Sequence, residues 1–411
     1  MKFAHIADCH LGSWRQPELQ QLNLESFKKA IETCIQENVN FILFSGDLFD
    51  SAYPPIEILK ETFSEFRKLK ESKIKCYVIS GSHDYSVSGK TFLDVLEKAG
   101  FCEICKFEEQ KTEKAKDEKD EEAKDEKSDS IKNILLKPLN HEGFSIYGYP
   151  GKKSGLEVED LRKVFFEETN NFRILMLHTT MESARGTLPI DSVDINDIPK
   201  ADYYALGHLH LVHEYKISDN KYLIYPGPIF PNNFQELEDL KSGSFYIVEV
   251  NGYVKLTKKE LKTKSVLLVE IEIENALTAT NKILAEIDKQ DLQDKIILLR
   301  LKGKLKQGKT SDINFQEIQE KIKQKGAYVF LKNTSKLKTE ELEMEIETGN
   351  IEKIEETILK GFIEKNPSQF NKFISSLVDS LDLEKQEDEK SAVFESRLLG
   401  ELNKILNLDM R

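Results

Sequence analysis

Histidines and aspartates stand at a series of points where short apolar runs give way to polar or glycine turns. Such runs are typical of buried parallel strands, and the carboxyl ends of parallel strands meet at one edge of a sheet. Side chains that are far apart in the sequence would therefore come together at that edge. The residues in this series are Asp8, His10, Asp47, His83, Asp84, His178, His208 and His210.

Imidazoles and carboxylates together suit a divalent ion such as manganese, iron or zinc better than magnesium, which prefers oxygen ligands and its own waters. An aspartate at a strand end, here Asp47, can bridge two ions about 4 Å apart. Two such ions would hold and deprotonate a water molecule, clamp a phosphate and neutralise the charge that develops during in-line displacement. The series therefore predicts a two-metal phosphoesterase.

A structural role is the alternative for each motif taken alone. A single Asp-x-His or Gly-His-x-His is more often structural than metal-binding. Five of the eight histidines, however, fall into the ordered series. We therefore interpret the series as one site, and interpret His5, His141 and His213, which lie outside it, as packed or surface residues.

Alternating strand and helix patterns would position these side chains. Amphipathic helices are predicted over Leu22–Glu37 and Ile56–Leu69, between apolar runs. Strands that alternate with helices predict a layered α/β domain. The predicted strands are Lys2–Ala7, Val39–Ser45, Cys76–Ser80, Arg173–Leu177 and Tyr203–Leu206.

The segment Glu108–Ser130 differs from the rest of this domain. Charged residues make up 17 of its 23 positions, and none is strongly apolar. Such a segment cannot bury a core, so we expect a solvated, disordered insertion with no chemical role.

A second α/β unit and a helical segment follow. From Ser265 the pattern alternates strand, helix, strand, helix, strand, and after Gly349 it becomes helical. The clearest late helix is Asn366–Leu381, and a final one carries Phe394, Leu398, Leu402 and Leu406. We expect domains at 1–262, 263–345 and 346–411.

The net charge of −13 is unevenly distributed. Residues 1–250 carry a balance of −12, residues 251–340 a balance of +7 and residues 341–411 a balance of −8. The basic middle segment could bind a polyanion, which the total charge hides. No apolar run approaches the roughly 20 residues that a membrane-spanning helix needs, and Met1–Ala7 has a strand pattern rather than that of a signal peptide. We therefore expect a cytoplasmic protein with no membrane contact.

The motifs resemble those of calcineurin-like metallophosphoesterases in order and spacing. They are Asp8-x-His10, Gly46-Asp47, Gly81-Ser82-His83-Asp84, His178 and Gly207-His208-x-His210. Within that superfamily the first 260 residues or so are similar to DNA double-strand-break repair nucleases of the meiotic-recombination-eleven or SbcD type. The segments that carry this likeness are Lys2-Phe3-Ala4-His5-Ile6-Ala7-Asp8, Gly46-Asp47-Leu48-Phe49, Tyr204-Ala205-Leu206-Gly207-His208 and Tyr225-Pro226-Gly227.

The resemblance implies a fold: α/β, a four-layer β-sandwich flanked by helices, with a smaller α/β capping domain and a C-terminal helical segment. It also implies two divalent metal ions, for which we expect Mn²⁺. One ion would be held by Asp8, His10 and His210, the other by His178 and His208, with Asp47 as the bridge. His83 would act on the leaving oxygen of the scissile phosphate, and Asp84 would orient His83 by accepting its other ring proton.

Two positions depart from the family pattern. Ser82 stands where the family usually has an asparagine that gives its amide oxygen to the second ion, so a water would fill that place and the second ion should bind more weakly. Asp50 stands where nucleases of this type often carry histidine, which puts secondary phosphate contacts in doubt.

Several residues outside the metal ligands are candidates for DNA contact. Trp14, beside Arg15, could stack on a nucleotide or belong to the core, and Arg185 could touch phosphate or form a surface salt bridge. Lysines at every second position of a strand would point to one face and could follow a phosphate backbone, although a solvated face is the alternative. These lysines are Lys302, Lys304 and Lys306.

The resemblance implies a metal-dependent DNA exonuclease and endonuclease of 3′–5′ type, acting in double-strand-break repair as a homodimer. Its partner would be a coiled-coil ATPase of the structural-maintenance-of-chromosomes type, docked on the C-terminal helices, which could instead pack on the chain itself. Two other functions stay open: a phosphodiesterase or phosphatase for small molecules, and a DNA-binding scaffold whose catalysis is weakened by Ser82.

Overall fold

The computed structural model of the chain describes residues 1–85, 91–111, 132–187, 189–339, 371–381, 383 and 391–406. By its contacts the chain divides into two units, Met1–Thr339 and Glu340–Arg411. This division does not test the domain boundaries expected at 262 and 345, which stay predictions. Of the charged segment 108–130, residues 112–130 lie outside the described residues.

The first sheet carries the order β15-β14-β1-β2-β3-β4. Its parallel part consists of β1 (Lys2–Ile6), β2 (Phe41–Ser45), β3 (Lys75–Ile79) and β4 (Glu103–Ile104). An antiparallel hairpin, β14 (Gly243–Val250) and β15 (Val254–Leu261), extends the β1 edge. The connecting helices are α1 (Pro17–Gln36), α2 (Ile56–Glu71) and α3 (Phe92–Lys98).

The second sheet carries the order β12-β13-β11-β10-β8-β7. Its four central strands are parallel: β8 (Phe144–Tyr149), β10 (Phe172–His178), β11 (Tyr203–Gly207) and β13 (Lys221–Pro226). The edge strands β7 (Leu139–His141) and β12 (Val212–Ser218) pair antiparallel. A small third sheet joins β5 (Phe107–Lys111), β6 (Lys132–Leu136) and β9 (Val164–Phe165).

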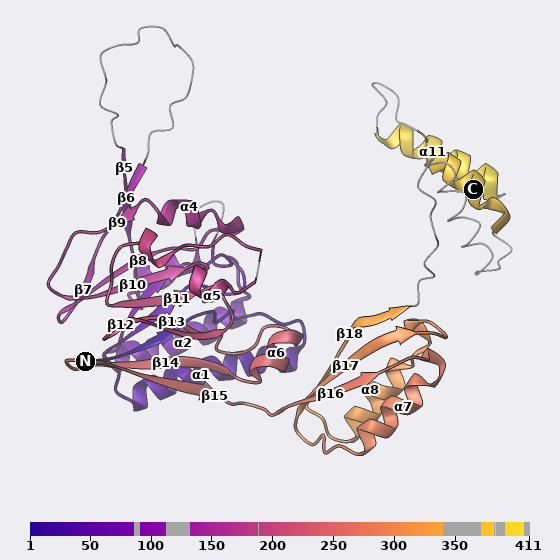
Figure 1. The fold of residues 1–411 in the computed structure, drawn as a ribbon, viewed down its shortest axis with the longest axis horizontal. Coiled ribbons are helices and arrows are strands. Elements are labelled where there is room, and N and C mark those ends of the chain that lie inside the picture. The colour runs from indigo at the N-terminus through magenta and orange to yellow at the C-terminus, as the bar shows by residue number, and fades with distance from the viewer. Residues whose placement is uncertain are drawn as a thin grey trace, which may run out of the picture. The chain divides into compact units, whose positions relative to one another are not determined.

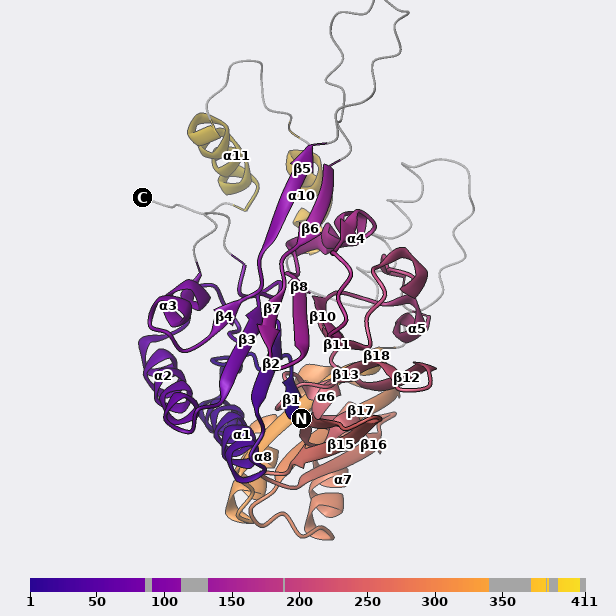
Figure 2. The same ribbon diagram turned by 90° about the vertical axis from the view of Figure 1, so that its left-hand side faces the viewer.

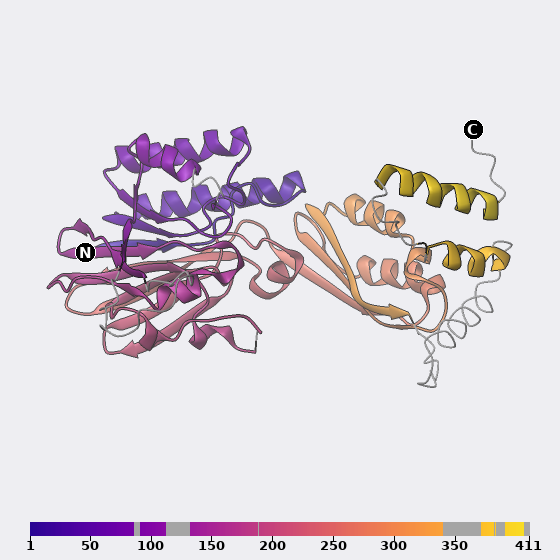
Figure 3. The same cartoon turned by 90° about the horizontal axis from the view of Figure 1, so that it is seen from above.

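The two large sheets are stacked, as the side-chain alternation of their strands requires. In β2, Ile42 and Phe44 face α1 and α2, whereas Phe41 and Leu43 pack against Ile174 and Met176 of the second sheet. The outer face of the second sheet is covered by α4 (Glu157–Leu161), α5 (Glu182–Arg185) and the segments around them. Figures 2 and 3 show these layers, with α1–α3 on one side of the sheets and α4 and α5 on the other. The predicted four-layer α/β fold is confirmed.

A second α/β unit, residues 266–339, follows the sandwich (Figure 1). Its parallel sheet has the order β16 (Val266–Glu272), β17 (Ile296–Leu305) and β18 (Val329–Thr339), and α7 (Ala276–Asp288) and α8 (Phe315–Gln324) cover one face. The apolar residues of the other face pack on α1 and on α6 (Phe234–Leu240). These contacting residues are Ile296, Leu298 and Leu331 on one side and Leu19, Leu22, Phe230 and Leu237 on the other.

In the C-terminal unit the structure describes a short 3₁₀ turn, Asn371–Phe373, and the helices α10 (Ile374–Leu381) and α11 (Ser391–Leu406). These helices agree with the two late helices that the sequence predicts, from residue 371 onward. Across the described part of the chain, no helix combines the length and the apolar character that crossing a membrane demands.

Candidate metal centre

The candidate ligands lie at the carboxyl ends of strands from both sheets. Asp8 follows β1 and Asp47 follows β2, while His178 ends β10 and His208 follows β11. Backbone hydrogen bonds hold the two loops of the first sheet together, from Asp8 N–H to the carbonyl of Gly46 and from His10 N–H to the carbonyl of Asp47. The sheets are joined here as well, because the backbone N–H of His208 donates to Asp8 Oδ1 at 2.9 Å.

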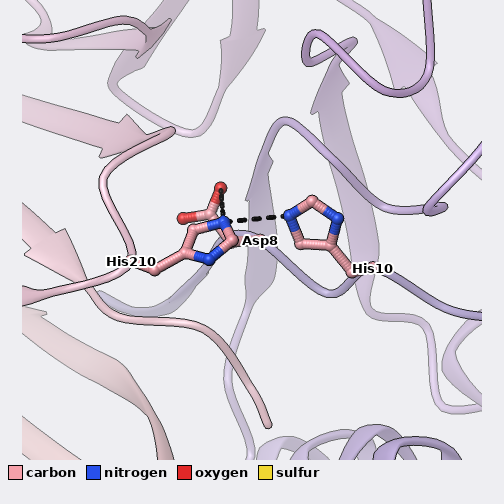
Figure 4. A group of neighbouring side chains, drawn as sticks. All are labelled: Asp8, His10 and His210. Atoms are coloured by element: carbon pink, nitrogen blue, oxygen red, sulfur yellow. Dashed lines mark hydrogen bonds and ion pairs between the residues drawn. The ribbon is translucent and has the colours of Figure 1, made fainter. Parts of the chain in front are cut away.

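Among the described residues, two groups of ligand atoms that share Asp8 form at this edge, each with its atoms within 4.8 Å of one another. The first group comprises Asp8, His10 and His210, with the two histidine Nε2 atoms 3.0 Å apart (Figure 4). The second comprises Asp8, Asp47 and His178, with Asp47 Oδ2 lying 3.1 Å from His178 Nε2. Asp47 Oδ2 is also 3.6 Å from His10 Nε2, so this carboxylate lies between the two groups.

The orientation of the rings fits a metal. Each of three histidines has its Nδ1 atom against an oxygen that can only accept a hydrogen bond: His10 on Asp50 Oδ1 at 3.1 Å, His178 on the Ser45 carbonyl at 3.0 Å, and His210 on Glu236 Oε1 at 2.9 Å. In the neutral ring Nδ1 then carries the proton and Nε2 offers its lone pair to the site, as metal-binding histidines do.

Unsatisfied polar atoms also indicate a cation site. Asp8 Oδ2 is buried and has no hydrogen-bond partner among the described residues, and the buried His178 Nε2 faces the Asp47 carboxylate at 3.1 Å. Buried polar atoms are rarely left in this state without a reason, and a cation is a ligand that both atoms would bind. The residues present therefore fit divalent ions of the borderline type.

Backbone strain is concentrated in the same residues. Asp8, His10, Asp47 and His208 have positive φ angles of 50°, 42°, 49° and 95°, which side chains other than glycine rarely adopt. Such conformations cost free energy and persist where the surrounding structure enforces them, often at functional sites. Four of the candidate ligands are thus held in backbone conformations that are locally unfavourable and that the surrounding structure enforces.

Two glycines leave the room that the His178 ring occupies. A Cβ atom on Gly46, whose φ is +87°, would lie 2.1 Å from His178 Nδ1. A Cβ atom on Gly207 would lie 2.1 Å from the Ser45 carbonyl oxygen and 2.9 Å from the same ring nitrogen. The Gly-Asp and Gly-His motifs therefore need glycine for a steric reason.

Charge inside the site is balanced by protons in the absence of metal. Burial alone would raise the pKa of Asp47, but the facing imidazole of His178 outweighs burial and holds that pKa below its usual range. Burial lowers the pKa of His178, yet the Asp47 carboxylate outweighs it and raises the pKa to about 10. Burial raises the pKa of Asp8. A proton therefore occupies the place in which a cation would lie.

His208 and Ser82 are the other two predicted ligands, and among the described residues His208 belongs to none of the ligand groups above. Burial, together with the neighbouring His178, lowers the pKa of His208 to about 4, so this ring is neutral and able to bind a metal at pH 7. The two rings meet edge to face with centroids 5.2 Å apart. The hydroxyl of Ser82 donates to Asp47 Oδ2 over 3.5 Å, a long hydrogen bond that leaves its oxygen near the site.

The predicted hydrogen bond between His83 and Asp84 is wrong. The Asp84 carboxylate is buried and accepts from three backbone N–H groups, those of Leu48, Phe49 and Gly81. His83 instead places Nδ1 3.0 Å from the Asp50 carbonyl and 3.6 Å from Asp50 Oδ1. The tight turn after β3 directs neighbouring side chains in opposite directions, so Asp84 orients the loop that carries Asp47 and does not orient His83.

Two acidic residues contact ligand histidines in a way that sequence reasoning did not foresee: Asp50, noted only as a departure from the family pattern, and Glu236. Asp50 is in contact with both His10 and His83, which form a third group of potential metal ligands with it. Glu236 holds His210. The pattern Asn233-x-x-Glu236 is the start signal of a helix, and that signal could have drawn attention to α6.

The comparison with protein families bears on the first half of the chain. The family model for calcineurin-like phosphoesterases matches residues 1–212. The chain belongs to the calcineurin-like phosphoesterase family. Its members are phosphoester hydrolases, and divalent metal ions are implied by the family and by the ligand groups described above.

Relatives within this calcineurin-like family carry two kinds of name. The chain is 26% identical over 352 residues to the DNA double-strand break repair protein Mre11 of Archaeoglobus fulgidus, covering 79% of this chain and 76% of the relative. It is 30% identical over 263 residues to the protein of the same name from Methanocaldococcus jannaschii, covering 61% and 63%. It is also 26% identical over 264 residues to the uncharacterized metallophosphoesterase YhaO of Bacillus subtilis, covering 61% and 58%.

The candidate DNA-contact residues of this family member differ in their surroundings. Trp14 is half-buried, packs against the cluster between α1, α6 and the second α/β unit, and donates from its indole N–H to the Pro231 carbonyl at 2.9 Å. This position favours the structural alternative for Trp14. Arg15 is exposed, and Arg185 donates to the Ile190 carbonyl at 3.5 Å.

The three candidate lysines of the second α/β unit lie at the end of β17 and just beyond it. Lys302 is paired with Glu270 at 2.6 Å and Lys306 with Glu274 at 2.7 Å. Lys304 lies between them in sequence and has an exposed side chain. The pairing reduces the net positive charge of this surface, so a polyanion would have to compete with two glutamates.

Proposed function

We propose that this phosphoesterase is a metal-dependent DNA nuclease that cleaves phosphodiester bonds, as exonuclease and endonuclease, in the repair of double-strand breaks. The observation that carries the proposal is the arrangement of His10, His178 and His210, whose Nε2 atoms face the carboxylates of Asp8 and Asp47. The likeness to archaeal proteins named Mre11 over most of the chain supports DNA as the substrate.

Asp8, His10 and His210 would hold one divalent ion, and His178 and His208 the other, with Asp47 between them; we propose Mn²⁺ for both. When bound, the ions supply Lewis-acid charge and a water of lowered pKa. Ser82 is too short to replace an amide ligand directly, which supports a weaker second site.

His83 would act on the leaving oxygen. Its side chain is half exposed, and Nδ1 is held by the Asp50 carbonyl, so Nε2 is the atom that remains available to a substrate. A ring with this orientation can donate a proton to, or stabilise charge on, the oxygen that departs from phosphorus. Because Asp84 is engaged with the backbone, we propose a positioning role for it.

DNA contact beyond the metal centre would involve the end of the second unit's sheet. Lys302 lies opposite Lys336 and Lys304 opposite Lys338 in the register of β17 and β18. The side chain of Lys302 is 43% exposed, and the other three lysines are exposed as well. Adjacent parallel strands that present lysines at matched positions give a basic surface that suits a phosphate backbone. Arg15 and Arg185 remain candidates for further phosphate contacts.

The C-terminal helices are proposed as the docking element for a coiled-coil ATPase. Exposed leucines on both support this role: Leu381 on α10 and Leu399 on α11 are 65% and 53% exposed. A homodimer acting on DNA in the cytoplasm completes the proposal. Copurification of the ATPase with the full chain but not with a chain ending at residue 345 is the expected result, and retention after truncation would contradict it.

The deciding experiment is cleavage of labelled duplex DNA in the presence and absence of Mn²⁺ by the unaltered chain and by His83→Ala. We expect Mn²⁺-dependent cleavage that falls by about 100-fold to 10,000-fold in the variant, the usual range for loss of a general acid. Metal binding should be retained. His213→Ala, which removes a histidine outside the ligand set, serves as the control, and cleavage by His83→Ala at the rate of the unaltered chain would contradict the assignment.

A small-molecule phosphodiesterase is the second candidate, and the ion pairs of Lys302 and Lys306 favour it because they neutralise part of the proposed DNA surface. The same preparation separates the two candidates. Hydrolysis of bis(p-nitrophenyl) phosphate without cleavage of DNA of any form would support the small-molecule function.

A further inference from the structure

We propose that Arg300 of the second α/β unit positions the metal ligand His210, acting through helix α6 and its residue Glu236. The inference rests on the proposed metal centre and adds to it a group that lies in another part of the chain. Three observations carry it: the fixation of Glu236 on His210, the shortness of α6, and the burial of Arg300 against that helix.

Glu236 is fixed at both of its carboxylate oxygens. Oε1 accepts from His210 Nδ1 at 2.9 Å, and Oε2 accepts from the backbone N–H of Asn232 at 2.8 Å. Its side chain is 16% exposed. A carboxylate in this position selects the ring form in which Nε2 is free, and fixes the direction in which Nε2 points. The orientation of His210 therefore depends on where α6 holds Glu236.

Helix α6 is too short to hold that position by itself. It has seven residues, begins at the cap residue Asn233, whose side chain accepts from the Glu236 N–H, and ends before Lys241 in a left-handed conformation. Helices of this length are not stable in isolation and take their position from tertiary packing. On α6 the buried side chain is Leu237, which belongs to the cluster shared with β17 and β18.

Arg300 supplies the polar part of that packing. It is 1% exposed in the middle of the apolar strand β17, and its Nε donates to Glu238 Oε2 at 2.8 Å. Its Nη2 atom donates to Gln235 Oε1 at 2.8 Å and also contacts Glu238. The guanidinium lies over the ring of Phe234, 5.0 Å from its centroid.

These contacts divide the helix into two faces. Phe234, Gln235 and Glu238 contact Arg300, while Glu236 contacts His210. The neighbouring residues of this strand, Ile296 to Leu299, are buried and apolar. A buried charge among them is costly, and such charges are often retained because they specify how two elements pack together. We assign Arg300 that role: it fixes α6, and α6 fixes the ligand.

The test is to measure Mn²⁺ binding to the full chain, both by calorimetry and by the electron paramagnetic resonance signal of the Mn²⁺ that stays free. Arg300→Met and Glu238→Gln are expected to weaken one of two Mn²⁺ sites by about 10-fold to 100-fold, the usual effect of removing an outer partner of a metal ligand. The other site should change by less than about twofold. Arg173→Met, which breaks the arginine–aspartate pair with Asp202 at the opposite end of β10, is the matched control and should leave both sites unchanged.

A second readout distinguishes positioning from general loss of structure. In metal-free protein labelled with ¹⁵N-histidine, the ring nitrogen shifts of His210 should lose the pattern of an Nδ1–H ring in Arg300→Met and in Glu236→Gln, but not in Arg173→Met. Combining Arg300→Met with Glu236→Gln should weaken Mn²⁺ binding no further than Glu236→Gln alone, because both act on the same ligand.

Unchanged Mn²⁺ binding by Arg300→Met and Glu238→Gln would overturn the inference, as would equal weakening of both sites or additive effects in the double variant. Failure of the unaltered chain to bind Mn²⁺ would overturn the proposed function and this inference together. The two failures are therefore distinguishable without any assay of DNA cleavage.

Discussion

His178 Nε2 lies 3.1 Å from Asp47 Oδ2, with both side chains buried, although the histidine ends a strand of one sheet and the aspartate follows a strand of the other. The pair joins the two halves of the sandwich at the centre of the candidate site. In the absence of metal its charge is balanced by the proton on His178, whose pKa is raised to about 10 by the facing carboxylate against the effect of burial.

Metal binding should therefore release protons. A histidine binds a cation only in its neutral form, and near pH 7, well below a pKa of about 10, His178 is protonated when the site holds no metal. Affinity for Mn²⁺ is then expected to fall as pH falls, by up to about tenfold for each pH unit while this proton has to leave. Calorimetric titration in two buffers of different ionisation enthalpy measures the protons released. Heats that do not depend on the buffer would contradict the prediction.

Replacement of Gly46 by alanine should damage both stability and metal binding. The added Cβ would lie 2.1 Å from His178 Nδ1, and the φ of +87° is unfavourable for any side chain. Strain of the backbone and overpacking together should lower the free energy of unfolding by about 2 to 5 kcal/mol. Gly143→Ala is the matched control, because its φ is +88° and nothing lies within 4 Å of the new Cβ. Chemical denaturation that shows equal losses for the two variants would contradict the steric argument.

Ser82→Asn should strengthen the second metal site. The asparagine restores the amide that the family pattern places there, whereas the serine hydroxyl makes only a long contact with Asp47. We expect Mn²⁺ to bind the weaker site about tenfold more tightly, with Ser82→Ala as the control for removal of the hydroxyl. Titration of Mn²⁺ by calorimetry measures the change. Equal affinities in Ser82→Asn and Ser82→Ala would show that this position does not contribute a ligand.

Replacement of Asp84 should mainly lower stability, whereas replacement of Asp50 should mainly lower metal affinity and hydrolysis. Asp84→Ala leaves the buried N–H groups of Leu48, Phe49 and Gly81 without their acceptor, so the free energy of unfolding should fall by about 3 kcal/mol or more. Asp50→Ala removes a half-exposed carboxylate that contacts His10 and His83, and should reduce Mn²⁺ affinity and hydrolysis by about tenfold or more with little loss of stability. Thermal unfolding and hydrolysis of a model phosphodiester measure the two effects, and the reverse pattern would exclude these roles.

Charge reversal of Lys302, Lys304 and Lys306 should weaken duplex binding and flatten its salt dependence. For every phosphate that the protein no longer neutralises, the slope of the logarithm of affinity against the logarithm of salt concentration becomes shallower by about 0.9. Reversal of Lys255, Lys258 and Lys262, in and just after β15, is the matched control. Fluorescence anisotropy with labelled duplex at several salt concentrations gives the slopes. Equal slopes for the two variants would exclude a DNA-binding role for the end of β17.

The ends of the buried strands were predictable because an apolar run followed by a polar ligand residue, directly or after a glycine, is a local signal. Asp8 and His178 directly follow such runs, and Asp47 follows one after Gly46. The strands β12 and β15 were not predicted, since their exposed faces carry lysine and glutamate, which blur the pattern of a strand. The strand β14 was missed although Phe245–Val248 is a buried apolar run. The orientation of Asp84 could not be inferred either, because it depends on backbone donors from a loop some 35 residues earlier in the sequence.

The features of the site that could not be predicted depend on contacts between residues far apart in the sequence. The sequence does not distinguish between an exposed and a packed Trp14. Its surroundings depend on contacts with Pro231 and with the second α/β unit, which lie far away in the sequence. The roles of Asp50 and Glu236 likewise depend on residues about 40 and 26 positions away. Positive φ angles at four ligands oppose local preference, so these backbone conformations could not be predicted from local propensity, although the residues themselves were identified.

Because the candidate ligands come from both sheets, each bound ion would also link the two sheets and stabilise the folded domain. Ions present at 100 times their dissociation constant would add about 2.7 kcal/mol per site to the folded state, if the unfolded chain does not bind them. Shortage of the metal would then do more than halt hydrolysis: it would raise the fraction of unfolded chains open to proteases. The abundance of this protein in a cell should accordingly follow the supply of its metal.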